Sequence, residues 1–140
     1  MRVLIDTCII VDALQNREPF KDDAQKIFLL AANQHFTGYI TAKSATDIYY
    51  LTRRSTHSEK TSREVLSKLF KLFDLLDTDG IDCRKAIPSP ITDFEDAVMV
   101  ETAAREEIDF IVTRNLCDYD KSSVKTLSPK EFLSENGVND

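Results

Sequence analysis

The first twelve residues constrain the fold most strongly, because a short apolar run in them ends abruptly on a carboxylate. The run Val3–Ile5 is typical of a buried β-strand, and Asp6 and the hydroxyl of Thr7 follow it directly. Burying a carboxylate beside such a strand costs free energy unless the carboxylate is paired or used. In open parallel sheets, ligands bind at the carboxyl ends of the strands. We therefore interpret Asp6 as the first candidate functional residue.

The rest of the chain alternates between helical periodicity and short apolar strands. The predicted helices cover residues 7–14, 22–33, 41–54, 61–76, 81–87, 92–106 and 129–137. The predicted strands lie at residues 3–5, 39–40, 75–78, 109–113 and 124–127. Thr92 is expected to cap its helix, with Glu95 completing a capping box. The alternation indicates an α/β protein whose parallel sheet has helices on both faces. Without a repeat or linker, we expect one domain over residues 1–140.

Composition and charge exclude several classes of protein. The chain is 42% hydrophobic and 30% charged, which favours a globular domain over a disordered one. A net charge of −6 argues against a general nucleic-acid coat protein, but bound metal can neutralise the acids of a nuclease. The three cysteines have no zinc-site spacing, which favours a reducing compartment. Without an apolar leader or membrane-length segment, we expect a cytoplasmic protein that does not bind membranes.

Four acids stand where this architecture can bring them to one edge of the sheet. They are Asp6, Asp47, Asp96 and Asp118. Hard divalent cations such as Mg²⁺ and Mn²⁺ prefer carboxylate oxygens and retained waters. Two such ions can activate a water and stabilise the leaving oxygen when a phosphodiester is hydrolysed. The four acids are therefore candidate metal-binding and catalytic residues.

Each of these acids except Asp6 also has an ordinary structural interpretation. Asp47 can take part in helix capping, because Ser44 lies three residues before it. Asp93 and Asp96 can complement the dipole of the helix that starts near residue 92, and Asp93 is the better candidate for that role. Asp118 can be an ordinary loop acid. The directly preceding apolar run makes Asp6 the hardest of them to explain in this way.

Neighbouring polar residues allow two interpretations as well. Thr7 and Thr113 can orient the acids through hydrogen bonds, or they can simply cap strand ends. Arg114 can contact a phosphate or be an ordinary surface arginine. A group of basic residues in the middle of the chain is either a nucleic-acid track or a set of helix-surface charges. The group consists of Lys43, Arg53, Arg54, Lys60 and Arg63.

Taken in order, several segments resemble the PIN-domain family, especially its bacterial VapC-like branch. They are Val3–Thr7 with Val11-Asp12 and Arg17–Phe20, then Ser44–Leu51, Asp93–Ala97, Ile111–Asn115 with Asp118-Tyr119, and Leu127–Leu133. Each segment alone is a weak match, but the ordered set is fairly specific and covers nearly the whole chain. The resemblance implies a three-layer α/β/α sandwich around a central parallel sheet.

The resemblance also implies a function and a site. Many such proteins are Mg²⁺- or Mn²⁺-dependent ribonucleases that act as toxins, are neutralised by an antitoxin encoded beside them, and form dimers. By position, the metal-binding acids would be Asp6, Asp47 and Asp96. The fourth position is either Asn115 or Asp118, and we prefer Asp118 because it carries charge.

This sequence departs from the family pattern at two positions. Cys8 stands where the family often has asparagine, which removes a supporting hydrogen bond. Asp47 stands where the family often has glutamate, and its shorter side chain changes the reach to a metal or makes the contact water-mediated.

The sequence therefore supports one leading hypothesis and two rivals. The leading hypothesis is a divalent-metal-dependent endoribonuclease that cleaves RNA as the toxin of a type II toxin–antitoxin pair. The first rival is a catalytically inactive PIN-like module that binds protein or RNA. The second rival, a flap-type DNA nuclease, is disfavoured by the short chain.

Overall fold

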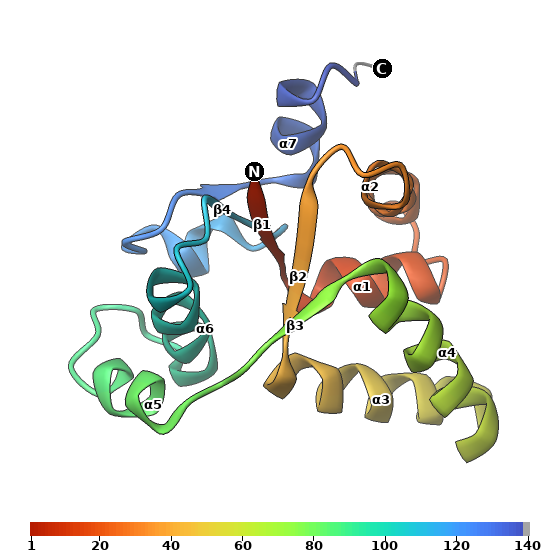
Figure 1. The fold of residues 1–140 in the computed structure, drawn as a ribbon, viewed down its shortest axis with the longest axis horizontal. Helices are drawn as coiled ribbons and strands as arrows, with labels where there is room; N and C mark the ends of the chain where they lie inside the picture. The colour runs from red at the N-terminus through yellow and green to blue at the C-terminus, as the bar shows by residue number, and fades with distance from the viewer. Residues whose placement is uncertain (139–140) are drawn as a thin grey trace.

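The computed structural model describes residues 1–138 and contains a five-stranded sheet in which all paired strands are parallel (Figure 1). The strands are β1 (Arg2–Ile5), β2 (Thr37–Thr41), β3 (Asp74–Leu76), β4 (Phe110–Val112) and β5 (Thr126–Leu127). Their order is β3-β2-β1-β4-β5, which puts β1 at the centre. The helices are α1 (Thr7–Leu14), α2 (Lys21–Ala32), α3 (Ala42–Thr56), α4 (Glu59–Leu72), α5 (Gly80–Ala86), α6 (Phe94–Arg105) and α7 (Pro129–Glu135), and η1 (Leu116–Tyr119) is a 3₁₀ turn.

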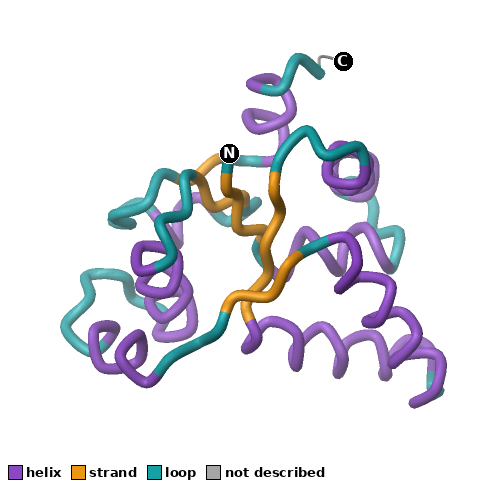
Figure 2. The backbone as a smooth tube through the Cα atoms, in the orientation of Figure 1, coloured by secondary structure: helices purple, strands orange, loops and turns teal. Residues whose placement is uncertain are grey.

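The helices lie in two layers, one on each face of the sheet (Figure 2). An apolar cluster packs each layer against the sheet. Successive residues of a strand point to opposite faces. Accordingly, Val3 and Ile5 pack in the cluster that includes residues of α1, α2, α3, α4 and α7. Leu4 packs in the cluster formed with α5, α6 and η1. The predicted α/β/α sandwich is therefore confirmed. The predicted domain also includes residues 139–140, which lie outside the described residues.

The strand order brings the carboxyl ends of β1 and β4 together. Ile5 is paired with Val112, and the backbone N–H of Asp6 donates to the carbonyl oxygen of Val112 over 3.0 Å. Asp6 and Thr113 therefore leave their strands side by side, although they lie 107 residues apart in sequence. On the other side of β1, β2 ends at Thr41, which caps α3 by accepting a hydrogen bond from the backbone N–H of Ser44.

Two local predictions are wrong, the end of the helix predicted over residues 61–76 and the residue that caps α6. The predicted helix over residues 61–76 ends at Leu72, because the following residues form β3 and pair with β2. Phe73 and Leu76 continue the apolar pattern, but they are buried beyond the helix. Thr92 does not cap α6. Asp93 does, accepting a hydrogen bond from the backbone N–H of Asp96 over 3.0 Å.

The elements that carry the predicted site residues otherwise match the sequence predictions closely. The helix predicted over residues 7–14 has the same bounds as α1, and the strand predicted over residues 109–113 contains β4. Within residues 1–138, no helix combines the length and the hydropathy that crossing a bilayer requires.

Candidate functional site

Asp6 lies at the carboxyl end of the central strand with its side chain 8% exposed. Its Oδ2 accepts a hydrogen bond of 2.8 Å from Thr113 Oγ1. Asp6 is the N-cap of α1, but its side chain makes no capping hydrogen bond. Burial raises the pKa of Asp6 above its ordinary value, and the hydrogen bond from Thr113 opposes this rise only in part. The Asp6 carboxylate is therefore held by Thr113 and does not cap α1.

Cys8 provides a second donor to the same carboxylate oxygen. Its Sγ lies 3.6 Å from Asp6 Oδ2. Burial, together with the charge of Asp6, raises the pKa of the Cys8 thiol to about 11. The thiol therefore keeps its proton at neutral pH and acts as a weak donor. Cys8 thus still donates to Asp6, through a long sulfur contact, and the loss of the hydrogen bond that an asparagine would make there stays a prediction.

Asp96 faces the same region from the first turn of α6. Its Oδ1 accepts a hydrogen bond of 2.9 Å from the hydroxyl of Tyr119. Burial raises the pKa of Asp96 to about 6, and the charges of Asp93, Asp6 and Asp118 add to the rise. Asp6 and Asp96 therefore belong to one cluster of mutually repelling carboxylates, which a bound cation would stabilise.

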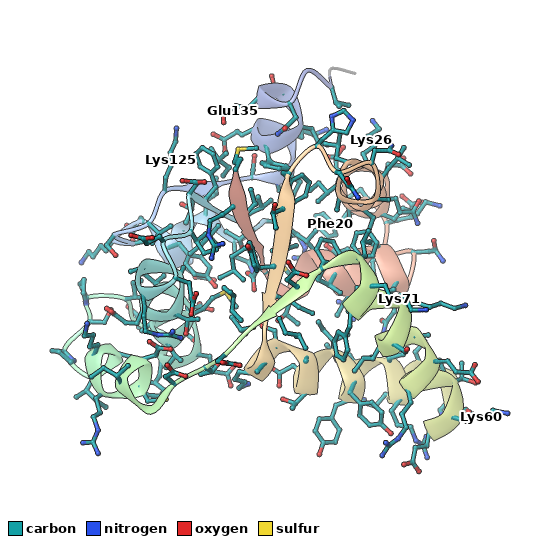
Figure 3. All side chains as sticks on the ribbon, in the orientation of Figure 1. Phe20, Lys26, Lys60, Lys71, Lys125 and Glu135 are labelled. Carbon is teal, nitrogen blue, oxygen red and sulfur yellow. The ribbon has the colours of Figure 1, made fainter. Side chains whose placement is uncertain are left out.

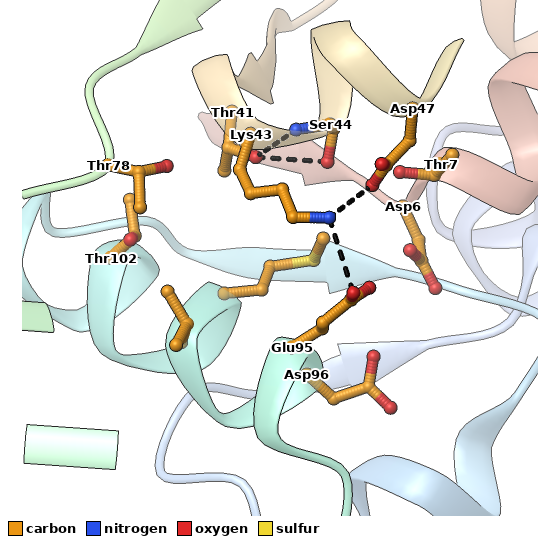
Figure 4. A pocket seen from close by; sticks show the side chains of 12 residues that line it. Asp6, Thr7, Thr41, Lys43, Ser44, Asp47, Thr78, Glu95, Asp96 and Thr102 are labelled. Atoms are coloured by element: carbon orange, nitrogen blue, oxygen red, sulfur yellow. Dashed lines mark hydrogen bonds and ion pairs between the residues drawn. The ribbon is translucent and has the colours of Figure 1, made fainter. Parts of the chain in front are cut away.

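These two acids line a cavity of about 160 Å³ between the strand ends, α3 and α6 (Figure 4). Two further acids, Asp47 and Glu95, line it as well. Hydroxyl groups and one ammonium group complete its polar lining, from Thr7, Thr41, Ser44, Thr78, Thr102 and Lys43. Three of the four predicted site acids thus border one cavity.

Asp47 lines this cavity as one partner of an ion pair with Lys43. Its Oδ2 lies 2.7 Å from Nζ of Lys43, one helical turn before it on α3. The same Nζ lies 3.3 Å from Glu95 Oε1 on α6. The capping interpretation of Asp47 is wrong, because Thr41 is the residue that caps α3. The i, i+4 spacing of Lys43 and Asp47 is the sequence signal that could have indicated this pair.

Asp118 lies outside the cavity. It is exposed on η1 and lines a neighbouring hollow together with Asp93 and Asp120. Its charge nevertheless reaches Asp96, whose pKa it helps to raise. Asn115, the other candidate for this position, donates its backbone N–H to Thr113 Oγ1 over 3.1 Å.

The donor groups of the cavity fit a hard divalent cation in part. Asp6 and Asp96 offer carboxylate oxygens, and within residues 1–138 no lysine or arginine forms an ion pair with either of them. Burial is the main cause of the raised pKa of both groups, and at Asp96 the neighbouring negative charges of Asp93, Asp6 and Asp118 add to it. No three acidic, histidine or cysteine side chains of the described residues converge closely enough to form a complete metal-binding group. Asp47 and Asp118 would have to move to join the first two acids.

Arg114 has a partner that the sequence did not indicate. Its Nε donates to Oδ2 of Asp12 over 2.8 Å, and its Nη2 donates to Oδ1 over 3.3 Å. Asp12 is only 1% exposed, and the guanidinium group lies 4.2 Å from the centre of the Phe20 ring. The pair ties α1 to the segment after β4, beside Thr113. The sequence signal for this pair was the position of Asp12 on the apolar helix α1, because a fully buried acid almost always has a partner.

The basic residues that the sequence offered as a possible nucleic-acid track lie in different surroundings. Lys43 lies in the acidic cavity, whereas Arg63 pairs with Glu59 on the surface of α4. The labelled side chains of Figure 3 show other lysines, including Lys60 and Lys125, spread around the periphery of the molecule.

Comparisons with known proteins identify a family and a fold. The family model described as PIN domain matches residues 2–116. Among solved structures, VapBC2 from Rickettsia felis, bound to a promoter DNA fragment, is 15% identical with a TM-score of 0.67, covering 91% of this chain and 98% of that chain. A toxin–antitoxin complex from Klebsiella pneumoniae is 19% identical with a TM-score of 0.67, covering 92% and 98%.

VapBC-1 from nontypeable Haemophilus influenzae is 14% identical with a TM-score of 0.68, again covering 92% and 98%. No curated protein matches the sequence. At these identities, the likeness to the solved structures is a likeness of fold.

Proposed function

Because this chain belongs to the PIN-domain family, we propose that it is a divalent-metal-dependent endoribonuclease that acts as the toxin of a type II toxin–antitoxin pair. One observation carries the proposal: Asp6 and Asp96, from different elements, border one cavity, and burial raises the pKa of both. The fold likeness to VapBC complexes supports the toxin role and a cognate antitoxin as partner. We also expect a homodimer, which light scattering can test.

Each acid has a defined role in this proposal. Asp6 and Asp96 would hold Mg²⁺ or Mn²⁺ directly, and Asp47 would complete the site or orient the attacking water. Asp118 would support a second metal ion or the water. A bound divalent ion would lower the pKa of a water and stabilise charge on the phosphate oxygens. In-line attack by this water would leave a 5′-phosphate and a 3′-hydroxyl on the products.

Neighbouring residues keep the two principal carboxylates facing the cavity. Thr113 fixes Asp6, and Tyr119 fixes Asp96, each through one hydroxyl hydrogen bond. Such supporting bonds restrict the rotation of a ligand side chain and so preserve its geometry when a metal binds.

The direct test is cleavage of single-stranded RNA in Mg²⁺ or Mn²⁺, with and without a chelator. Wild-type protein should cleave only with the metal, and Asp6→Asn and Asp96→Asn should each lose nearly all activity. Asp22→Asn is a matched control, because Asp22 is an exposed acid in the first turn of α2. Cleavage that survives both the chelator and Asp6→Asn would overturn the mechanism.

The ion pair between Lys43 and Asp47 favours a second candidate, a catalytically inactive PIN-like module that binds protein or RNA. In such a module, the pair would neutralise Asp47 permanently. Metal titration followed by thermal unfolding separates the candidates. Absence of both a metal-induced shift and RNA cleavage would favour the inactive module.

A further inference from the structure

Lys43 crosses the acidic cavity and joins two helices that approach it from opposite faces of the sheet. Its ammonium nitrogen lies 2.7 Å from Asp47 Oδ2 on α3 and 3.3 Å from Glu95 Oε1 on α6 (Figure 4). The backbone of Lys43 lies in the first turn of α3, next to the buried N-cap Thr41, and its side chain is 41% exposed, against 39% for Asp47 and 69% for Glu95. The bridge therefore lies at the solvent-accessible side of the cavity, with its shorter and less exposed contact to Asp47.

The charges around the cavity explain why a cation lies there. Among the residues that line it, four are acidic and Lys43 alone is basic. The guanidinium of Arg114 is the cation that lowers the pKa of Asp6, and it is engaged by the buried Asp12. Lys43 thus offsets part of the negative charge of Asp47 and Glu95, the two cavity acids with which it pairs.

This arrangement affects Asp47 most directly. The Asp47 oxygen that accepts the short hydrogen bond from Lys43 cannot hold a divalent ion while the ammonium group stays beside it, because two cations would then repel at close range. The acids of the described residues also do not converge into a group of three. The ammonium group and a metal ion would compete for the same carboxylate.

We propose that Lys43 is a positioning residue that competes with the divalent cation for Asp47, so that metal binding must displace its ammonium group. The inference rests on the proposed function, because it requires that the cavity bind metal. In the free protein, the single positive charge of Lys43 would be shared between Asp47, its closer partner, and Glu95, and would offset one of their two negative charges. It would thereby set the metal concentration at which Asp47 joins Asp6 and Asp96.

The test is calorimetric titration of Mg²⁺ and Mn²⁺ into four proteins: wild type, Lys43→Gln, Lys43→Arg and Lys21→Gln. Lys43→Gln should bind metal roughly tenfold more tightly, a size typical of coupling between neighbouring charges. Lys43→Arg keeps the charge and should stay close to wild type. Lys21→Gln is the matched control, because Lys21 forms an exposed ion pair of 2.9 Å with Glu18 and does not line the cavity.

A double-variant cycle tests whether Lys43 acts through Asp47. In an Asp47→Asn background, Lys43→Gln should change the metal Kd much less than it does in the wild-type background. A purely structural role for Lys43 predicts the opposite sign in the single variant, since loosening α3 against α6 would weaken metal binding. An equal effect in both backgrounds would overturn the route through Asp47.

The outcomes separate this inference from the proposed function. If wild type binds metal and Asp6→Asn does not, but Lys43→Gln binds no more tightly than wild type, the inference fails and the proposed function stands. If neither wild type nor Lys43→Gln binds metal, both fail. If Lys43→Gln binds metal where wild type does not, the inference is supported in its strongest form.

Discussion

Thr113 Oγ1 donates a 2.8 Å hydrogen bond to Asp6 Oδ2 and so links the ends of β1 and β4 beside the acidic cavity that Asp6 lines. The same hydroxyl oxygen accepts a hydrogen bond of 3.1 Å from the backbone N–H of Asn115. That second bond directs the hydroxyl proton toward Asp6. Since Thr113 is fully buried, the orientation of Asp6 depends on a contact that solvent cannot replace.

Replacing Thr113 by valine should therefore weaken the site while preserving the side chain's shape. Asp6 would lose its shortest hydrogen bond, and its pKa would rise further. We expect metal affinity and RNA cleavage to fall by about 10- to 100-fold, as is typical when the partner of a metal ligand is removed. Thr113→Ser retains the hydroxyl and should keep most of the activity. Unchanged metal affinity in the valine variant would contradict the assigned role.

The pKa of about 6 at Asp96 predicts a pH dependence. Metal binding requires the ionised carboxylate, so metal affinity and cleavage should fall as the pH drops below about 6. The folded-state pKa exceeds the ordinary value of 3.8, so the folded protein binds this proton more tightly than the unfolded chain does. In metal-free protein, the stability contributed by protonated Asp96 is therefore present below about pH 4 and is lost as the pH rises through 6.

Tyr119→Phe provides the check on this pH dependence. The variant loses the hydrogen bond that lowers the pKa of Asp96, so the midpoint of metal binding should move to higher pH. Kd measurements for Mn²⁺ between about pH 5 and 8 would detect the shift. A midpoint that stays in place or moves lower would argue against this role of the Tyr119 hydroxyl.

The pair formed by Asp12 and Arg114 should dominate stability beside the site. Arg114→Met would leave the buried Asp12 carboxylate without its cation, a change that typically costs about 3–5 kcal/mol. The double variant Asp12→Leu with Arg114→Met removes both charges and should recover much of that loss. Denaturant unfolding measures all three proteins. A double variant as unstable as Arg114→Met alone would show that the buried charge is not the cause.

Gly38 offers a test of packing between β2 and the segment after α4. A Cβ atom at this position would lie 2.6 Å from Cδ1 of the buried Phe73 ring and 3.1 Å from Cε2 of Phe36. Gly38→Ala should therefore destabilise the protein by about 1–3 kcal/mol through overpacking. Gly80→Ala is the matched control, because nothing lies within 4 Å of its added Cβ. Equal thermal stabilities of the two variants would refute the packing argument.

The sequence by itself determined the alternation of elements and the place of Asp6. Both are local properties, because an apolar run, its period and the residue that ends it lie within a few positions of one another. The ordered motifs also indicated the family, which the match over residues 2–116 confirmed. The end of α4 was predicted too late, since its apolar pattern runs on into the strand that the sequence also predicted over residues 75–78, and pairing with β2 decides where the helix gives way to that strand.

The tertiary structure alone decided which groups meet. The bonds from Thr113 to Asp6 and from Arg114 to Asp12 span 107 and 102 residues, and both depend on β4 lying next to β1. The bridge from Lys43 to Glu95 likewise depends on how α3 and α6 approach the cavity from opposite faces of the sheet. Strand order sets these distances, and it follows from packing over the whole domain, which no local pattern of residues encodes.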